Sequence, residues 1–188
     1  MPHIELEKHL PGVTGLLEFR KDTGDLLREL TQVLLKGPST LSEGERELIA
    51  TIVSHRNDCT YCKTSHTAVA NAYLGESKTS EMVKEDIETA PISEKMKALL
   101  QIAALVQVSG KKVYDPAVQR AKNAGATDLE IHDTVMIAAL FSFYNRYVDG
   151  LATIAPQDPI YYTDMAKRLA ENGYHRPTKG YDSNKIPT

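Results

Sequence analysis

Residues 42–66 read SEGERELIATIVSHRNDCTYCKTSH, and this stretch predicts two consecutive helices. Ser42 followed by Glu45 is a capping box, the side-chain pattern that begins a helix. The helix behind it carries apolar residues at helical spacing, namely Leu48, Ile49, Ile52 and Val53. Asparagine and aspartate at 57–58 mark a break, because both residues favour turns and helix caps. A second helix then runs over about 59–75.

Helical signals dominate the rest of the chain as well. Apolar spacing, capping residues and glycine or proline stops predict helices at about 26–36, 80–88, 93–110, 115–125, 127 to at least 144, and 158–173. No segment shows the long alternation that a half-buried strand needs. We therefore predict an all-α fold with a single domain over 1–173. Residues 174–188 form a polar C-terminal tail, expected to be loosely ordered or to lie against a partner subunit.

A faint internal repeat has an offset of about fifty residues, within the range of repeated helical units. Leu41-Ser42-Glu43 and Ile92-Ser93-Glu94 open two similar helices, and Gly75 recurs as Gly125. Identity between the copies is low, so chance similarity remains an alternative. In a true repeat, Glu47, Cys59, Cys62 and His66 correspond to Ala98, Gly110, Val113 and Ala117. The second copy then lacks every reactive group, so the fold does not require them.

Composition excludes several classes of protein. The 188 residues include 22 basic and 25 acidic side chains, a net charge of −3, so the basic excess of a nucleic-acid-binding protein is missing. The longest apolar stretch, Val135 to Phe141, is far too short to span a membrane. The N-terminal sequence MPHIELEKHL has no basic and apolar signal regions, which predicts a cytoplasmic protein.

Three chemically reactive residues share one face of the second predicted helix. Cys59, Cys62 and His66 are spaced by three and four residues, which places them one above another. The helix start favours a thiolate, and His66 can take the Cys62 proton. Two thiols at this spacing can also close a disulfide. The pattern is typical of thiol–disulfide or peroxide chemistry, in which one thiolate attacks and its neighbour resolves the oxidised sulfur.

Glu47 lies on the preceding helix, on a face with the small residues Ala50, Thr51 and Ser54. If this face meets the cysteine helix, Glu47 can orient His66 or relay its proton. An ordinary exposed helix carboxylate is the alternative.

Glu47, Ser54, Cys59, Cys62 and His66 together form the pattern E-x6-S-x4-C-x2-C-x3-H. This pattern resembles the AhpD-like alkylhydroperoxidases within the carboxymuconolactone decarboxylase family. The Cys-x-Tyr-Cys form, with Asn57-Asp58 ahead and Phe143-Tyr144-Asn145-Arg146 downstream, is most similar to the peroxidase-related branch. The wider resemblance covers roughly residues 15 to 155, including the two-copy helical layout.

The resemblance implies an AhpD-like helical bundle that forms homo-oligomers and reduces hydroperoxides. It implies that Cys62 attacks the peroxide, that Cys59 resolves the product, and that His66 and Glu47 relay protons. No bound cofactor is needed for that cycle. The sequence does not identify the thiol reductant, and a lipoyl protein, a thioredoxin-like protein or a small thiol could serve. The best-studied members carry a histidine where this chain has Tyr61, and a phenol is a poor base at neutral pH. Decarboxylase members lack the cysteine pair, which argues against that activity.

Other interpretations of the cysteine pair remain open. The two cysteines can be buried and inert. Cys59, Cys62 and His66 can be three zinc ligands, with His55 or Glu47 as the fourth. A redox or zinc-binding sensor, or a disulfide reductase without peroxide turnover, is the functional alternative. Haem attachment is excluded, since Lys63 rather than histidine follows the second cysteine.

Overall fold

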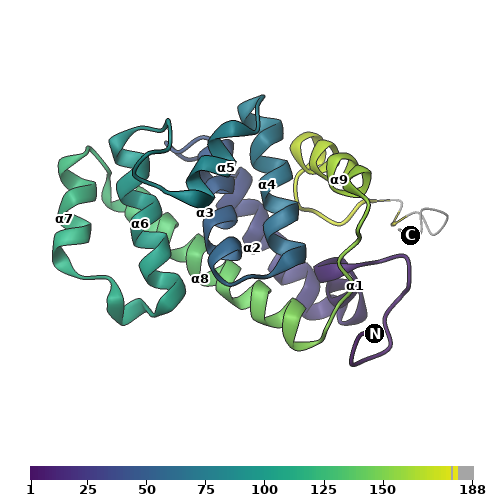
Figure 1. The fold of residues 1–188 in the computed structure, drawn as a ribbon. Coiled ribbons are helices and arrows are strands. Elements are labelled where there is room, and N and C mark those ends of the chain that lie inside the picture. Colours follow the sequence, from purple (N-terminus) through teal and green to yellow (C-terminus); the bar gives the residue numbers. More distant parts are fainter. Residues whose placement is uncertain (179, 182–188) are drawn as a thin grey trace.

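The chain was analysed as a computed structural model that describes residues 1–178 and 180–181. These residues form nine α-helices and one 3-10 helix, with no strand among them (Figure 1). The helices are α1 (Gly12–Phe19), α2 (Lys21–Lys36), α3 (Glu43–Arg56), α4 (Thr60–Leu74), α5 (Lys78–Glu85), α6 (Glu94–Val108), η1 (Gly110–Lys112), α7 (Asp115–Asn123), α8 (Asp128–Gly150) and α9 (Pro159–Asn172). The predicted all-α fold is confirmed.

Most predicted helix boundaries agree with the structure, because they rest on local caps. Ser42 and Glu45 form both hydrogen bonds of a capping box at the start of α3. Cys59 is the N-cap of α4, which ends before Gly75. The helix α1 was not predicted. Its N-cap, Pro11, offers no side-chain hydrogen bond, so the sequence carries no start signal there.

The helix α3 is the centre of the fold and packs against α4, α6 and α8. Every residue from Arg46 to Ser54 is buried. A helix enclosed on all sides needs apolar or small residues around its whole circumference. This is why Ala50, Thr51 and Ser54 lie opposite the Leu48–Val53 face, and why α3 can bring a side chain close to α4.

The helix α8 is attached to the core through a buried carboxylate. Glu130 closes a capping box with Thr127 at the start of α8. Its other oxygen accepts hydrogen bonds from Thr40 at 2.8 Å and from Lys95 at 2.7 Å. Burial disfavours the charged form, but these donors outweigh it and lower the pKa of Glu130 to about 2.

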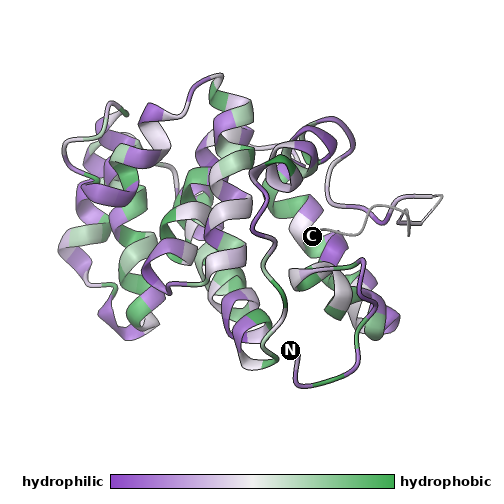
Figure 2. Ribbon diagram, turned by 45° about the vertical axis from the view of Figure 1, so that its right-hand side comes forward, coloured by the Kyte–Doolittle hydropathy of each residue, from purple (hydrophilic) through white to green (hydrophobic). Residues whose placement is uncertain are grey.

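The N-terminal segment, α1 and α9 build a second apolar cluster around α4, separate from the main core. Along the helices, hydrophobic and hydrophilic residues alternate (Figure 2), as expected where one face of a helix is buried. In the part of the chain that the structure describes, no helix combines the length and the apolar character needed to cross a membrane.

Candidate dithiol site

Both cysteines are free thiols buried at the start of α4. The Cys59 thiol lies near that of Cys62, and this neighbour together with burial raises the pKa of the Cys59 thiol. Cys62 lies in the first turn of α4, where the free N–H groups and the helix dipole favour an anion. The Cys59 thiol therefore stays protonated, whereas the position of Cys62 suits a thiolate.

A chain of side-chain amides holds the turn before Cys59. Gln107 donates to the Asn57 amide oxygen at 2.8 Å, and Asn57 donates to Asn145 at 2.8 Å. Asn145, on α8, donates in turn to the hydroxyl of Ser54 at 3.1 Å. Ser54 and Asn145 are both buried. These bonds join α3, α6 and α8 at the point where the chain turns into the cysteine helix.

A histidine–carboxylate pair lies one turn beyond Cys62. The Nδ1 atom of His66 is 2.7 Å from Oε2 of Glu47. Glu47 is fully buried on α3, so the ordinary exposed carboxylate considered above is wrong. The ring of Phe141 packs edge-on against His66, with ring centroids 4.4 Å apart. Because Glu47 accepts at Nδ1, the Nε2 atom of His66 is the one that can exchange a proton elsewhere.

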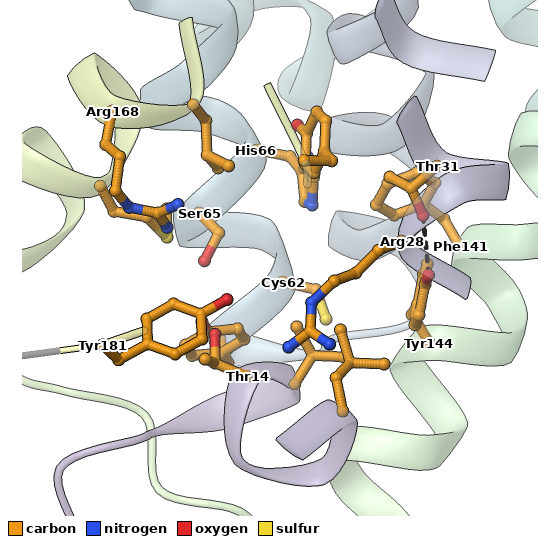
Figure 3. Close-up of a pocket in the computed structure, with 16 residues that line it drawn as sticks. Thr14, Arg28, Thr31, Cys62, Ser65, His66, Phe141, Tyr144, Arg168 and Tyr181 are labelled. Carbon is orange, nitrogen blue, oxygen red and sulfur yellow. Dashed lines mark hydrogen bonds between the residues drawn. The ribbon is translucent and has the colours of Figure 1, made fainter. Parts of the chain in front are cut away.

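An apolar cavity of about 80 Å³ adjoins Cys62 and His66 (Figure 3). It has room for several water molecules or for a hydroperoxide group with a few carbon atoms. Its lining includes Val13, Leu17, Phe141, Tyr144, Met165 and Leu169. Cys62 is part of the lining, whereas Cys59 is not. Arg28 also borders the cavity, but Glu18 and Asp25 hold its guanidinium at 2.8 and 3.1 Å.

Tyr61 is a packing residue in this structure. Its ring is buried against Gly12, where a Cβ atom would lie only 2.2 Å from it. The backbone of Gly12 has φ +58°, a conformation that favours glycine. Burial raises the pKa of Tyr61 well above its ordinary value, so the phenol stays protonated. A role as base in place of the family's histidine is therefore unsupported.

The zinc interpretation lacks a donor set in this geometry. Within the described residues, no group of three or more histidine, cysteine, aspartate or glutamate side chains is arranged to hold a metal ion. Glu47, one candidate for the fourth ligand, is instead paired with His66. His55, the other, lines a separate surface hollow with Lys63 and Lys84.

Sequence reasoning missed one residue at this site. Tyr174 donates its hydroxyl hydrogen bond to Oε1 of Glu47, the carboxylate oxygen that His66 does not contact. The sequence pattern places Tyr174 in the polar C-terminal tail and indicates no role for it. Its contact spans 127 residues of sequence, and no local pattern signals it. Residues 179 and 182–188 of that predicted tail lie outside the described residues.

Fold and site together define an all-α protein with a buried dithiol beside a histidine–carboxylate pair. The chain belongs to the carboxymuconolactone decarboxylase family, whose model matches residues 21–85 and again 76–155. The two matches agree with the two-copy helical repeat. A search of curated proteins found no match.

Solved structures share the fold. A peroxidase-related protein from Silicibacter sp. TM1040 is 25% identical, with 81% of this chain and 78% of that chain covered and a TM-score of 0.74. A peroxidase-related protein from Ralstonia eutropha JMP134, described as an AhpD alkylhydroperoxidase core, is 24% identical over 84% and 81% of the chains, with a TM-score of 0.74. A candidate AhpD antioxidant defence protein from Agrobacterium tumefaciens is 19% identical over 76% and 97%, with a TM-score of 0.66.

Proposed function

We propose that this protein is a thiol-dependent peroxidase that reduces organic or hydrogen peroxides through a dithiol–disulfide cycle. The observation that carries the proposal is the position of Cys62. It lies at a helix start, on the wall of an apolar cavity that also receives His66. Membership of a family that includes peroxidase-like proteins supports the same conclusion.

The first step is attack of the Cys62 thiolate on the outer oxygen of the peroxide. An S–O bond forms and the O–O bond breaks, so sulfur is oxidised to a sulfenic acid and the peroxide is reduced. The leaving alkoxide takes a proton and departs as an alcohol, or as water when the substrate is hydrogen peroxide. In this proposal His66 accepts the Cys62 proton and returns it to that oxygen, while Glu47 holds the ring.

The second step is attack of the Cys59 sulfur on the Cys62 sulfenic acid. An S–S bond forms and the S–O bond breaks, and the hydroxide leaves as water with the proton from Cys59. The proximity of the two thiols at the start of α4 supports this role, because Cys59 lies next to the sulfur that it must reach. One peroxide thus oxidises two thiols, without a bound cofactor.

An external thiol must then reduce the disulfide. A lipoyl protein, a thioredoxin-like protein or a small thiol has the required chemistry. Cytoplasmic thiol pools, which keep cysteines reduced, suit such a cycle. Because Cys59 is fully buried, we propose that the reductant attacks Cys62, whose sulfur borders the cavity.

Self-association is the remaining part of the proposal. The helix α2 exposes the apolar side chains of Leu26, Leu30 and Val33 at helical spacing. The neighbouring helix α8 exposes Phe143. Exposed apolar side chains grouped in this way are typical of protein–protein contacts, and a second copy of the chain is the proposed occupant.

The test uses the reduced protein and one equivalent of cumene hydroperoxide. Stopped-flow measurement should show rapid loss of peroxide, and intact mass should show loss of two hydrogen atoms, as for one internal disulfide. Cys62→Ser serves as the matched control and should leave the peroxide intact. Thiols that survive the peroxide unchanged would contradict the proposal, and disulfide exchange without peroxide turnover would favour the reductase alternative.

A further inference from the structure

The segment after α9 returns to the dithiol site. Tyr174 places its ring parallel to that of His66, with centroids 6.3 Å apart and an interplanar angle of 12°. Its hydroxyl donates to Oε1 of Glu47, while His66 bonds to Oε2 at 2.7 Å. The buried carboxylate is thus held between two donors, one on each oxygen.

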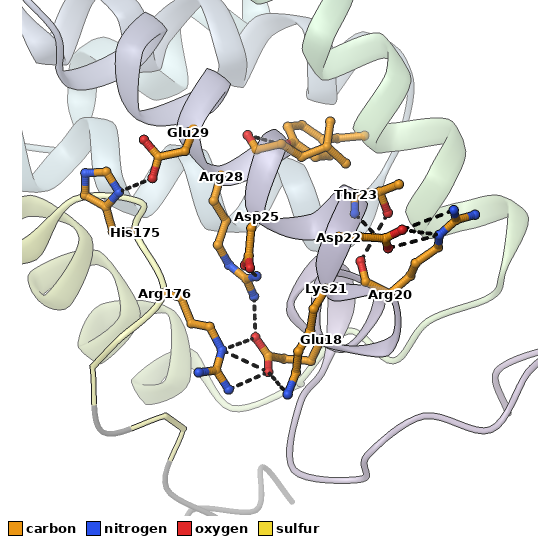
Figure 4. A network of polar contacts seen from close by, with 12 residues as sticks. Glu18, Arg20, Lys21, Asp22, Thr23, Asp25, Arg28, Glu29, His175 and Arg176 are labelled. Atoms are coloured by element: carbon orange, nitrogen blue, oxygen red, sulfur yellow. Dashed lines mark hydrogen bonds and ion pairs between the residues drawn. The ribbon is translucent and has the colours of Figure 1, made fainter.

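Residues 173–176, which we call the strap, are fastened to α1 and α2 (Figure 4). The backbone N–H of Tyr174 donates to the Gln32 side chain at 2.7 Å. His175 pairs with Glu29 at 2.8 Å, and Arg176 pairs with Glu18 at 2.9 Å. The partners Gln32, Glu29 and Glu18 precede the strap residues that they bind by 142, 146 and 158 positions in the sequence.

Gly173 gives the strap its direction. Its φ of +71° lies in the region that favours glycine, and a Cβ atom there would meet the Gln32 side-chain oxygen at 2.3 Å. That oxygen is the acceptor for the Tyr174 N–H. Any side chain at 173 would therefore displace the bond that sets the position of Tyr174.

We propose that Tyr174 is a positioning residue for the Glu47–His66 pair, and that its hydroxyl sets the pH at which the pair takes up a proton. The proposal rests on the proposed function, in which this pair handles the proton of Cys62. It makes the strap part of the site, although residues 173–176 lie beyond the stretch of chain that the family model matches.

The physical argument starts from the buried carboxylate. A donor on each oxygen stabilises the charged form, so a carboxylate that loses one donor binds a proton more tightly. Burial and the neighbouring Glu47 charge raise the pKa of Tyr174 well above its ordinary value, so its hydroxyl remains a donor throughout the working range. With Glu47 kept as a carboxylate, His66 keeps its Nδ1 proton pointed at it and leaves Nε2 free.

Other charged or titratable groups also surround the pair. Arg46 neighbours Glu47 on α3 and interacts with its charge, as does Tyr73 on α4. Arg168 on α9 acts on Tyr174, and α8 contributes the Phe141 ring. Of these, Arg46 donates its hydrogen bonds to the backbone oxygens of Leu34 and Gly37. Tyr174 is the group whose hydroxyl bonds directly to Glu47, so it is the one to change.

The test is Tyr174→Phe in the full chain, which keeps the ring and removes the hydroxyl. A hydrogen bond to a charged group corresponds to roughly a tenfold change in an equilibrium, or about one pH unit. We expect the acid limb of the peroxide-reduction profile to move up by about one pH unit. At pH values below this acid limb, the variant should reduce peroxide roughly tenfold more slowly than the parent protein. At pH values above the limb, the two rates should approach each other.

A second readout does not depend on peroxide turnover. The ring signals of His66, followed by NMR in the reduced protein, should show the pair taking up its proton at higher pH in the variant. Gly173→Ala, which displaces the strap, should move both readouts in the same direction. Tyr114→Phe is the matched control, because Tyr114 is an exposed tyrosine before α7 and outside the cavity lining, and it should move neither.

The outcomes separate this proposal from the peroxidase proposal. If the His66 titration moves but the parent protein consumes no peroxide, the positioning role stands and the peroxidase function fails. If peroxide is consumed and Tyr174→Phe slows it equally at every pH, with an unmoved titration, Tyr174 is only a structural residue and the proposal is overturned.

Discussion

Replacing Glu47 by glutamine separates the chemical role of this carboxylate from its structural role. Glu47 is fully buried and holds His66 at 2.7 Å on one oxygen and the Tyr174 hydroxyl on the other. Glutamine has nearly the same shape but only one acceptor. If its oxygen keeps the bond to Tyr174, its NH₂ group faces Nδ1 of His66. Because an NH₂ group can only donate, Nδ1 must lose its proton and Nε2 must carry it.

The expected magnitudes differ between activity and stability. A positioned proton-transfer group typically contributes 10²- to 10⁴-fold to rate, so we expect Glu47→Gln to slow peroxide reduction by roughly a hundredfold or more. The charge-assisted hydrogen bonds that disappear are worth about 1.5–3 kcal/mol each. Removing the buried charge also removes its desolvation penalty of several kcal/mol, which stabilises the folded state. The free energy of unfolding should therefore change by less than about 2 kcal/mol.

Stopped-flow peroxide consumption and urea unfolding measure these two quantities on the same sample. Glu43→Gln is the matched control. It removes a carboxylate from the first turn of the same helix, where Glu43 pairs with Lys36 at 3.2 Å on the surface side. That pair should be worth about 1 kcal/mol or less, and the rate should not change. A Glu47→Gln protein that keeps its rate while losing more than about 3 kcal/mol of stability would refute the relay.

Three further predictions concern the thiols, the acid stability and the assembly. Cys62→Ser should abolish peroxide consumption, and Cys59→Ser should consume one equivalent and leave a sulfenic acid that dimedone labels. The pKa of Glu130 falls from an ordinary 4.5 to about 2 in the folded state, so its contribution of about 3 kcal/mol is complete above pH 4.5 and is lost as the pH falls toward 2. Glu130→Gln should therefore lower stability at pH 7 by an amount of that order and flatten the acid side of the stability profile measured by urea unfolding. Leu26→Glu or Val33→Glu should lower the oligomeric state in sedimentation velocity, and an unchanged state would exclude the α2 face as the contact.

The helical fold could be predicted because its signals are local. The capping boxes at Ser42 and Thr127 lie within four residues of the helices that they begin, and both form as expected. The helix α1 could not be predicted because it lacks such a local signal: its N-cap, Pro11, makes no side-chain hydrogen bond. Its position depends instead on packing of Leu16 and Leu17 in the interior, which sequence alone does not display.

The site could be predicted only in part, and the limit follows from sequence distance. Cys59, Cys62 and His66 lie on one helix, so their common face follows from helical spacing. The contact of Glu47 with His66 was conditional on which helix α3 meets, and the structure supplies that contact. Tyr174 bonds to Glu47 across 127 residues, a pairing that only the packing of α9 against α4 decides.

The two helical copies differ in whether they carry reactive side chains. In the first, α3 and α4 carry Glu47 and the dithiol, whereas the corresponding α6 and η1–α7 region has Ala98 and Gly110. A buried carboxylate is costly unless it is hydrogen-bonded, so an apolar core position would serve the fold equally well. The first copy keeps the charge and adds a donor from outside the repeat, Tyr174, to hold it. Glu47 holds His66, which lies one helix turn beyond Cys62, and the proposed proton transfer would account for a buried carboxylate that packing alone does not require.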